Sequence, residues 1–319
     1  MFSRRHITQL ILSLFRFFFI LSICYIIISP LLNKISMSFM TPTDLYDRTV
    51  KVIPKHFTLA NYGDAVKYLD YFRRIGTTSL LCALVGLLQA LSCTVVGYGF
   101  ARFRFKGNKM LFVLVVVLMV VPTQILLTPQ YLNFKAVGLI NGLTPFILLG
   151  ATATGPRCGL YIFLARQYYR GIPREIDEAA AIDGAGPFQV FTRIMLRSGV
   201  PTMVTIFLFS FVWQWAENSY TPLFGGSYPT LARILQSLGY DVQTKMNGSG
   251  YSFVSSADFE AYQSIIFAAS TLLVILPLLF VYVVCQRFFI QSIEQTDNKE
   301  AVVRRVLYGA GDDSDHADG

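Results

Sequence analysis

Charged residues are scarce in this sequence. They make up 14% of its 319 residues, against about 25% in an ordinary soluble domain. Hydrophobic residues make up 54%, which is more apolar side-chain area than a core of this size can absorb. Part of that area must therefore face something other than water, and a lipid bilayer is the simplest candidate. The composition excludes two soluble domains and predicts one membrane domain.

The sequence also lacks the residues that several kinds of chemistry need. No Gly-x-x-x-x-Gly-Lys-Ser/Thr phosphate loop is present, so we do not expect the chain to hydrolyse ATP or to be an enzyme. No nucleophile–base pair or metal constellation stands out. The three histidines are scattered, and the cysteines form no C-x-x-C pair, so we expect no metal site and interpret the cysteines as small buried hydrophobes: Cys24, Cys82, Cys93, Cys158 and Cys285.

Six apolar segments are each long enough to cross a bilayer as a helix, which takes about 20 residues. They are too long and too uniformly apolar to be barrel strands. Pro122 and Pro129 interrupt the third segment, and Gly155 with Pro156 indicates a break in the fourth. The sequence therefore predicts an all-α integral membrane domain over 11–290, with spans at 11–32, 76–101, 110–131, 143–164, 200–223 and 265–285.

Basic residues indicate the orientation, because Lys and Arg are enriched in short cytoplasmic loops. They are dense in the loops after the second span and after the fourth, at Arg102, Arg104, Lys106, Lys109, Arg166, Arg170, Arg174, Arg193 and Arg197. This topology explains the net charge of +8 without nucleic acid. We expect a multi-pass protein of a bacterial or archaeal cell membrane with a cytoplasmic N-terminus (1–10), no cleaved signal peptide, and a cytoplasmic, partly disordered tail (291–319).

The loop 166–199, between the fourth and fifth spans, has the pattern of two short helices. Pro173 and the acidic residues Glu175, Asp177 and Glu178 suit a helix N-terminus, and three alanines favour the helix that follows. Gly184 permits a sharp turn, after which Pro187 can open a second helix with an apolar face of Phe188, Phe191, Ile194 and Met195. Such an elbow either caps the helix bundle or docks into a groove of a soluble partner.

The residues of this loop carry a resemblance to a known family. Glu178-Ala179-Ala180, Asp183-Gly184-Ala185, Ile194 and Leu196 resemble the EAA loop of ABC importer permeases, in particular the sugar-importing group that includes the maltose permease subunits. Trp215, Tyr220–Leu223 and the Ala101–Gly107 segment are similar to that group as well. The chain departs from it at Arg197, where the family usually has a proline.

The resemblance implies a division of labour among several chains. It implies a second permease, homologous and non-identical, two cytoplasmic ATPase subunits that hold ATP and magnesium, and a solute-binding protein outside. The chain itself is then expected to need no cofactor. The implied function is import of a sugar or oligosaccharide, coupled to ATPase closure through Glu175, Glu178, Ala179, Ala180, Asp183, Gly184, Ala185, Phe191 and Ile194. The alternatives are another cargo, such as a polyamine or phosphate, and, from a different class, a secondary transporter.

Polar residues within the spans are candidates for the solute pathway. Thr123 and Gln124 either line a pathway or satisfy backbone groups freed by the nearby prolines. Trp213, Trp215, Glu217 and Asn218 lie late in the fifth span, where tryptophan is also common for membrane reasons alone. Arg157, a charge within the fourth span, is either a functional residue or a structural partner at a subunit interface.

Overall fold

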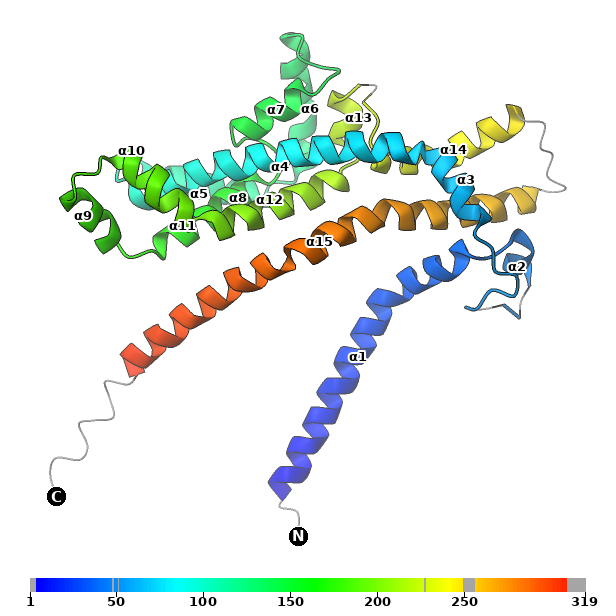
Figure 1. The fold of residues 1–319 in the computed structure, drawn as a ribbon, viewed down its shortest axis with the longest axis horizontal. Helices are drawn as coiled ribbons and strands as arrows, with labels where there is room; N and C mark the ends of the chain where they lie inside the picture. The colour runs from blue at the N-terminus through cyan, green and yellow to red at the C-terminus, as the bar shows by residue number, and fades with distance from the viewer. Residues whose placement is uncertain (1–3, 48, 51, 227, 249–255, 309–319) are drawn as a thin grey trace. The chain divides into compact units, whose positions relative to one another are not determined.

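The computed structural model describes residues 4–47, 49–50, 52–226, 228–248 and 256–308 (Figure 1). Every regular element among these residues is helical. Three helices are long and apolar enough to cross a membrane, or up to five spans if each of two bent helix pairs counts as one. The all-helical membrane architecture is therefore confirmed, while the count of six spans remains a prediction.

The chain forms two compact units. The first comprises residues 1–74 and 234–277, and the second comprises 75–233 and 278–319. The helices, in chain order, are α1 (Arg4–Ser38), α2 (Pro42–Tyr46), α3 (Ala60–Leu69), α4 (Tyr71–Arg102), α5 (Asn108–Val120), α6 (Thr123–Ala136), α7 (Thr144–Ala151), α8 (Cys158–Arg170), α9 (Glu175–Ile182), α10 (Pro187–Gln189), a π-helix (Val190–Met195), α11 (Leu196–Ser198), α12 (Val200–Trp215), α13 (Tyr220–Phe224), α14 (Leu231–Gly248) and α15 (Ser256–Tyr308).

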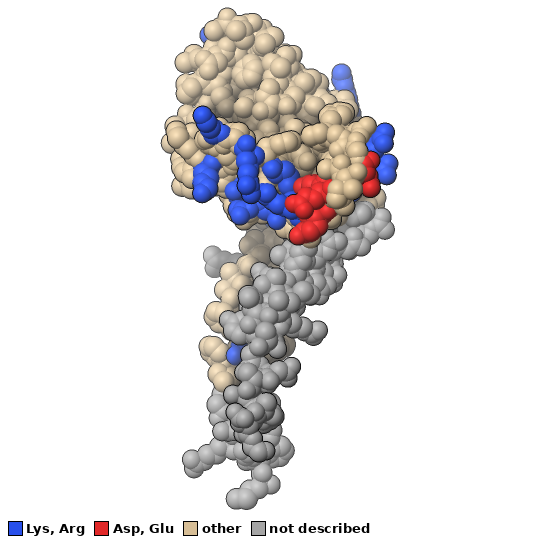
Figure 2. All heavy atoms as spheres, turned by 90° about the vertical axis from the view of Figure 1, so that its left-hand side faces the viewer, with Lys and Arg blue, Asp and Glu red and all other residues tan. Residues whose placement is uncertain are grey.

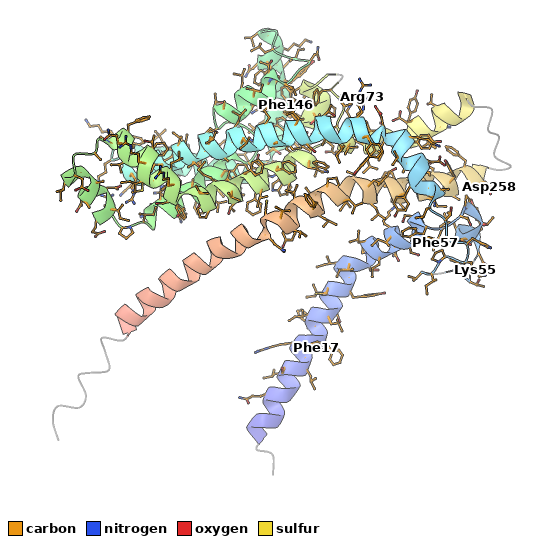
Figure 3. The ribbon with its side chains drawn as sticks, viewed as in Figure 1. Phe17, Lys55, Phe57, Arg73, Phe146 and Asp258 are labelled. Atoms are coloured by element: carbon orange, nitrogen blue, oxygen red, sulfur yellow. The ribbon has the colours of Figure 1, made fainter. Side chains whose placement is uncertain are left out.

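In the first unit, α1 leaves its apolar side chains uncovered on all sides (Figure 3). Phe17 is 60% exposed and Ile26 is 70% exposed. Water would penalise such a surface, so α1 suits lipid or a partner helix. The small core of this unit joins the α14 residues Leu238 and Val242 to Ile266 of α15.

In the second unit, α4, α8 and α12 pack around a core that includes Cys93, Tyr161 and Ile206. Close approach of α4 to α8 depends on Gly97, because a Cβ there would lie 2.5 Å from the Cβ of Ala165. Small residues at such crossings are typical of membrane helices, where packing replaces the hydrophobic effect.

Several expected segments have different ends in the structure. The third span is two helices, α5 and α6, which are bent by 105° at Pro122, while Pro129 is accommodated inside α6. The fourth is divided into α7 and α8 at the expected Gly-Pro break. The fifth was predicted too long: α12 ends at Trp215, and a separate short helix, α13, covers the rest.

The segments predicted to be loops or tail also contain helix. The stretch between the fifth and sixth predicted spans holds α14, and α15 continues past 285, the predicted end of the sixth span, to Tyr308. The end of the tail 291–319, part of which we expect to be disordered, lies outside the described residues from 309 onward.

Candidate functional site

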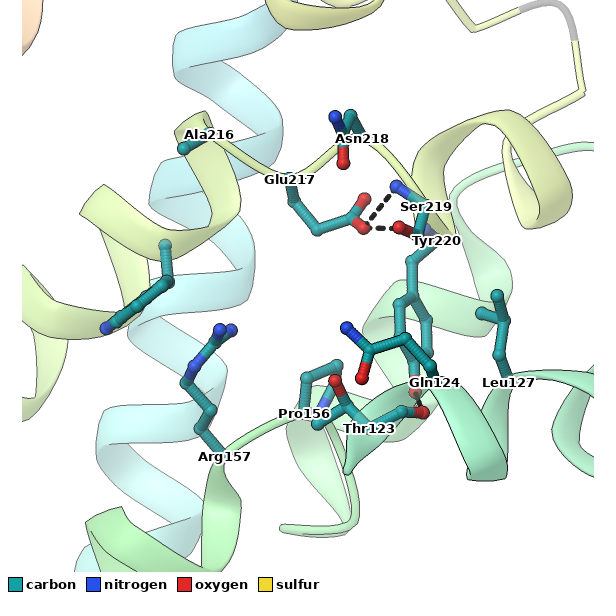
Figure 4. Close-up of a pocket in the computed structure, with 11 residues that line it drawn as sticks. Thr123, Gln124, Leu127, Pro156, Arg157, Ala216, Glu217, Asn218, Ser219 and Tyr220 are labelled. Carbon is teal, nitrogen blue, oxygen red and sulfur yellow. Dashed lines mark hydrogen bonds between the residues drawn. The ribbon is translucent and has the colours of Figure 1, made fainter. Parts of the chain in front are cut away.

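A polar pocket of about 160 Å³ lies within the second unit, where α6, α8, α12 and α13 meet (Figure 4). Five of the residues predicted for the solute pathway line it: Thr123, Gln124, Trp213, Glu217 and Asn218. The remaining lining residues are Leu127, Pro156, Arg157, Ala216, Ser219 and Tyr220. The fold thus brings the third-span residues together with those that follow the fifth.

Trp215, the sixth residue predicted for the pathway, does not line this pocket. It is 3% exposed, and its ring stacks on Phe211 with the centroids 5.8 Å apart. Residues two positions apart on a helix point to nearly opposite sides, so Trp213 and Trp215 cannot both face the pocket.

Arg157 is held in the pocket wall by its own chain. It sits just before α8 with a left-handed backbone (φ 63°), a conformation that costs a non-glycine residue about 1 kcal/mol. Its guanidinium carbon lies 3.5 Å from the centroid of the Trp213 ring, within the range of a cation–π contact. Arg157 therefore has a structural partner in this chain and also lines the pocket.

Glu217 ties down the start of α13. One carboxylate oxygen accepts from the backbone N–H groups of Ser219 (2.5 Å) and Tyr220 (2.6 Å), and the other accepts from the N–H (2.8 Å) and hydroxyl of Thr221. These are N–H groups that a helix start leaves without intrahelical partners. The Glu217 carboxylate therefore fixes the start of α13, which forms part of the pocket wall.

Within the loop 166–199, α9 is followed by a turn and then by α10, the π-helix and α11, and the turn has a specific geometry. Gly184 has φ +83°, the Gly184 N–H donates to Ala181, and the Ala185 N–H donates to Ala180. This pairing is a Schellman motif, which satisfies the last carbonyls of α9. The Gly-Ala pair therefore ends α9 and reverses the chain.

An anchor cluster holds the inner side of this loop against α4 and α8. It consists of Tyr98, Tyr169, Ala180, Val190 and Met195, all buried. The Tyr98 ring meets the Tyr169 ring at 5.3 Å and the half-buried Phe191 ring at 4.7 Å, centroid to centroid. Ala180, one of the residues expected to couple to the ATPase, thus packs against the chain's own helices.

Arg102 links the end of α4 to the start of the loop. One of its terminal nitrogens donates to the Ile172 carbonyl at 3.0 Å, and the other lies 3.4 Å from the Asp177 carboxylate. The Arg102 side chain is only 6% exposed. Sequence reasoning counted Arg102 merely as a cytoplasmic charge and Asp177 as one of the acidic residues at the start of a helix; no pattern in the sequence separates Arg102 from Arg104.

The outer side of the loop is exposed. Ile182 is 86% exposed and Phe188 is 78% exposed. The exposed members of the predicted set are Glu175, Glu178, Ala179, Asp183 and Gly184, whereas Ala185, Phe191 and Ile194 are half-buried. Figure 2 shows acidic side chains gathered beside a broad basic group on one face of the molecule.

The loop enters α12 through a bend of 67° at Gly199, which lies tightly against α8. A Cβ at Gly199 would lie 2.1 Å from the Tyr169 hydroxyl oxygen. Arg197, in the place of the family proline, is exposed in the last turn of α11, and Pro201 lies in the first turn of α12. The bend is therefore formed without the missing proline.

No group of three His, Cys, Asp or Glu side chains is placed to hold a metal ion in the part of the chain that the structure describes. Cys82, Cys93 and Cys158 are buried as free thiols, and Cys24 is exposed.

Comparison with known proteins agrees with this arrangement. The chain is 27% identical over 277 residues to the arabinooligosaccharides transport system permease protein AraQ of Halalkalibacterium halodurans, covering 85% of this chain and 91% of that one. It is 26% identical over 289 residues to the galactooligosaccharides transport system permease protein GanQ of Bacillus subtilis, covering 88% and 93%.

The fold is also shared with a solved structure, that of a bacterial ABC transporter involved in the import of the acidic polysaccharide alginate. The TM-score is 0.70 at 18% identity, over 91% of this chain and 99% of the other. Residues 93–295 match the family described as binding-protein-dependent transport system inner membrane component. With that match spanning more than half of the sequence, the chain belongs to the inner-membrane components of binding-protein-dependent transport systems.

Proposed function

We propose that this chain is the permease subunit of an ATP-driven importer, and that its loop 166–199 couples a cytoplasmic ATPase to the transport pathway. One observation carries the proposal: the loop is anchored on its inner side and exposes Glu178, Ile182 and Phe188 on its outer side. Large apolar side chains that point into water mark a contact surface. A short helix with such a face fits a groove on a partner protein.

The anchor makes the loop a rigid link. Because Arg102, Tyr98 and Tyr169 hold it to α4 and α8, a displacement of the docked partner passes directly to those helices. Two-state, rigid-body switching between inward-open and outward-open forms requires such a connection. A mobile loop would absorb the movement.

We infer that the cargo is an uncharged sugar or oligosaccharide, as the names of the relatives suggest. In the polar pocket, the Glu217 carboxylate accepts hydrogen bonds from the start of α13, so it is not free to pair with a cationic solute. Hydroxyl and amide groups beside an aromatic ring suit a polyhydroxylated solute. A polyamine would need an unengaged carboxylate. The engaged state of Glu217 also disfavours an ion-coupled secondary transporter.

The rest of the assembly follows from the same proposal. The spans are α1, α4, α5 with α6, α7 with α8, α12 and α15, and both termini are cytoplasmic. The pocket, at about 160 Å³, is smaller than the ~300–1,000 Å³ of a typical ligand site, so a second, homologous permease completes it. Two ATPase subunits hold ATP and magnesium, and a binding protein delivers the solute from outside.

The test uses the reconstituted complex of both permeases, the ATPases and the binding protein in proteoliposomes. Ile182→Asp places a charge on the proposed contact, and we expect ATPase co-purification and sugar uptake to fall by roughly tenfold or more, as for a contact hot spot. Val137→Asp is the matched control, since Val137 is also exposed (66%) but lies at the end of α6. Equal retention of the ATPase in both variants would refute the docking role.

A second variant tests coupling itself. Gly184→Asp strains the left-handed turn that ends α9, and we expect ATP hydrolysis to continue without uptake. Normal uptake by a fully assembled Gly184→Asp complex would contradict the coupling role. The cargo is tested separately, by competing labelled oligosaccharide uptake with spermidine and with phosphate; inhibition by either would contradict the sugar assignment.

A further inference from the structure

A second cavity, the basic pocket, lies apart from the polar pocket and from the exposed side chains of α9 and α10. It measures about 600 Å³ and lies in the second unit between the end of α4, the turn that follows it, the first turn of α5 and the last turns of α8. This volume is within the ~300–1,000 Å³ of typical small-molecule sites. It is therefore large enough for a ligand headgroup.

Four basic side chains line the basic pocket, and no acidic one does: Arg104, Lys109, Arg166 and Arg170. None of the four is in an ion pair with a carboxylate among the described residues. Arg166 and Arg170 are one helical turn apart, so their like charges repel. An anion in the pocket would relieve that repulsion.

Arg166 is partly preset for such an anion. Its guanidinium carbon lies 3.7 Å from the centroid of the Phe112 ring, which fixes the plane of the group, and its Nε is buried without a hydrogen-bond partner. At the start of α5 the Asn108 N–H donates to the Phe105 carbonyl, Gly107 provides no side-chain cap, and the next N–H groups, of Lys109 and Met110, have no intrahelical acceptor. A planar guanidinium beside free N–H groups is a common phosphate site.

The other walls of the pocket are apolar, and the apolar surface continues beyond it. Phe103 and Phe105 are 49% and 46% exposed, and Met110, at the pocket edge, is 70% exposed. Along α5 the exposed side chains remain apolar, with Val113 at 58% and Val117 at 50%. A free anion would use only the basic part, whereas a phospholipid would use both.

We propose that the basic pocket binds the headgroup of an anionic phospholipid, with its acyl chains lying along α5. Under the orientation proposed above, this lipid belongs to the cytoplasmic leaflet, whose surface is negatively charged. The pocket is then a specific lipid site on the permease, separate from the solute pocket and from the exposed side of the loop.

The test measures lipid retained by the purified full complex, after reconstitution in phosphatidylcholine alone or mixed with phosphatidylglycerol. For the wild type, we expect native mass spectrometry to show phosphatidylglycerol that survives delipidation. For Arg166→Gln with Arg170→Gln, we expect retention to fall by roughly tenfold or more, because two basic contacts with an anionic headgroup are lost. Arg166→Lys with Arg170→Lys keeps the charge and is expected to retain most of the lipid.

Arg193→Gln with Arg197→Gln is the matched control, since these two residues have the same spacing and are exposed but do not line the pocket. An equal loss in the control and in the pocket variant would overturn the proposal. So would displacement of phosphatidylglycerol by inorganic phosphate alone, which would make the pocket a free-anion site. If the Gln pair unfolds the complex, Arg104→Gln with Lys109→Gln, at exposed positions, gives the deciding measurement; undiminished retention there overturns the proposal.

Discussion

The polar pocket and the loop 166–199 lie in the same unit but use their charged side chains in opposite ways. In the pocket, Glu217 accepts hydrogen bonds from the start of α13 and Arg157 stacks on Trp213, so both charged groups have partners within the chain. In the loop, Asp177 is engaged and Glu175 and Glu178 are exposed. Charged side chains thus help to build the first region, while in the second they are also exposed at the surface.

The largest effect is expected at Gly199, where the loop packs tightly against α8. Gly199→Ala would drive a Cβ against the Tyr169 hydroxyl, and Tyr169 is fully buried. Overpacking of this kind costs about 1–3 kcal/mol. We expect a lower thermal midpoint for the purified complex. Gly99→Ala, a helical position with nothing within 4 Å, is expected to stabilise by about 0.5–1 kcal/mol instead. The same sign for both variants would contradict the close packing at Gly199.

The next largest effect is expected for the ion pair between Arg102 and Asp177. Arg102→Ala removes the hydrogen bond to Ile172 and leaves Asp177 unpaired, at a cost of about 1–3 kcal/mol, with the lower end favoured because Asp177 is 30% exposed. We expect faster amide hydrogen exchange over 172–182. Arg104→Ala, an exposed neighbour, should leave that exchange unchanged. If both variants exchange alike, Arg102 is not an anchor.

In the pocket, we expect a residue that holds the fold to affect stability and a residue that faces the ligand to affect uptake. Glu217→Ala removes the cap of α13 and should cost about 0.5–2 kcal/mol of stability. Asn218→Ala, at an exposed pocket residue, should leave the thermal midpoint unchanged and raise the KM for uptake. A stability loss at Asn218 equal to that at Glu217 would remove the distinction between them.

The smallest effect concerns Asp44, a third carboxylate that is held by neighbouring groups of the chain. Asp44 is buried, which raises its pKa, but hydrogen bonds from the His56 ring and backbone N–H outweigh burial and hold the pKa of Asp44 below its usual value. A lowered pKa stabilises the fold above the unfolded value of about 3.9 and loses that effect as pH falls through the folded value. Protease resistance of the segment 36–62 should therefore be constant from about pH 7 to pH 5 and fall below about pH 4. In Asp44→Asn this change should be absent; its persistence there would assign it to another group.

Sequence reasoning succeeded where a single local rule decides the outcome. Gly184 was correctly placed at a turn, because only a left-handed residue ends α9 there, and the helices on either side follow from Ala and Pro. The pocket residues Thr123 and Glu217 were singled out as polar groups in apolar runs. These residues come together because α5 and α6 are bent by 105°. Pro122 predicts a bend at this point, but the sequence does not give its angle.

Tertiary contacts account for what sequence reasoning missed. Ala179 and Ala180 are identical in type, and only packing against Tyr98 and Tyr169 decides that Ala180 turns inward. The early end of α12 depends on Glu217, which caps the next helix and so favours a break that hydropathy alone does not indicate.

The attachment of the loop to the very end of α4 has a mechanical consequence. This single helix of 32 residues is about 48 Å long at 1.5 Å per residue. A tilt of roughly 5° about Arg102 would shift its opposite end by roughly 4 Å, given that length. Under the proposed coupling role, the helix acts as a lever arm whose short side is the loop, so a small rotation at the loop becomes a movement of roughly 4 Å at the Tyr71 end.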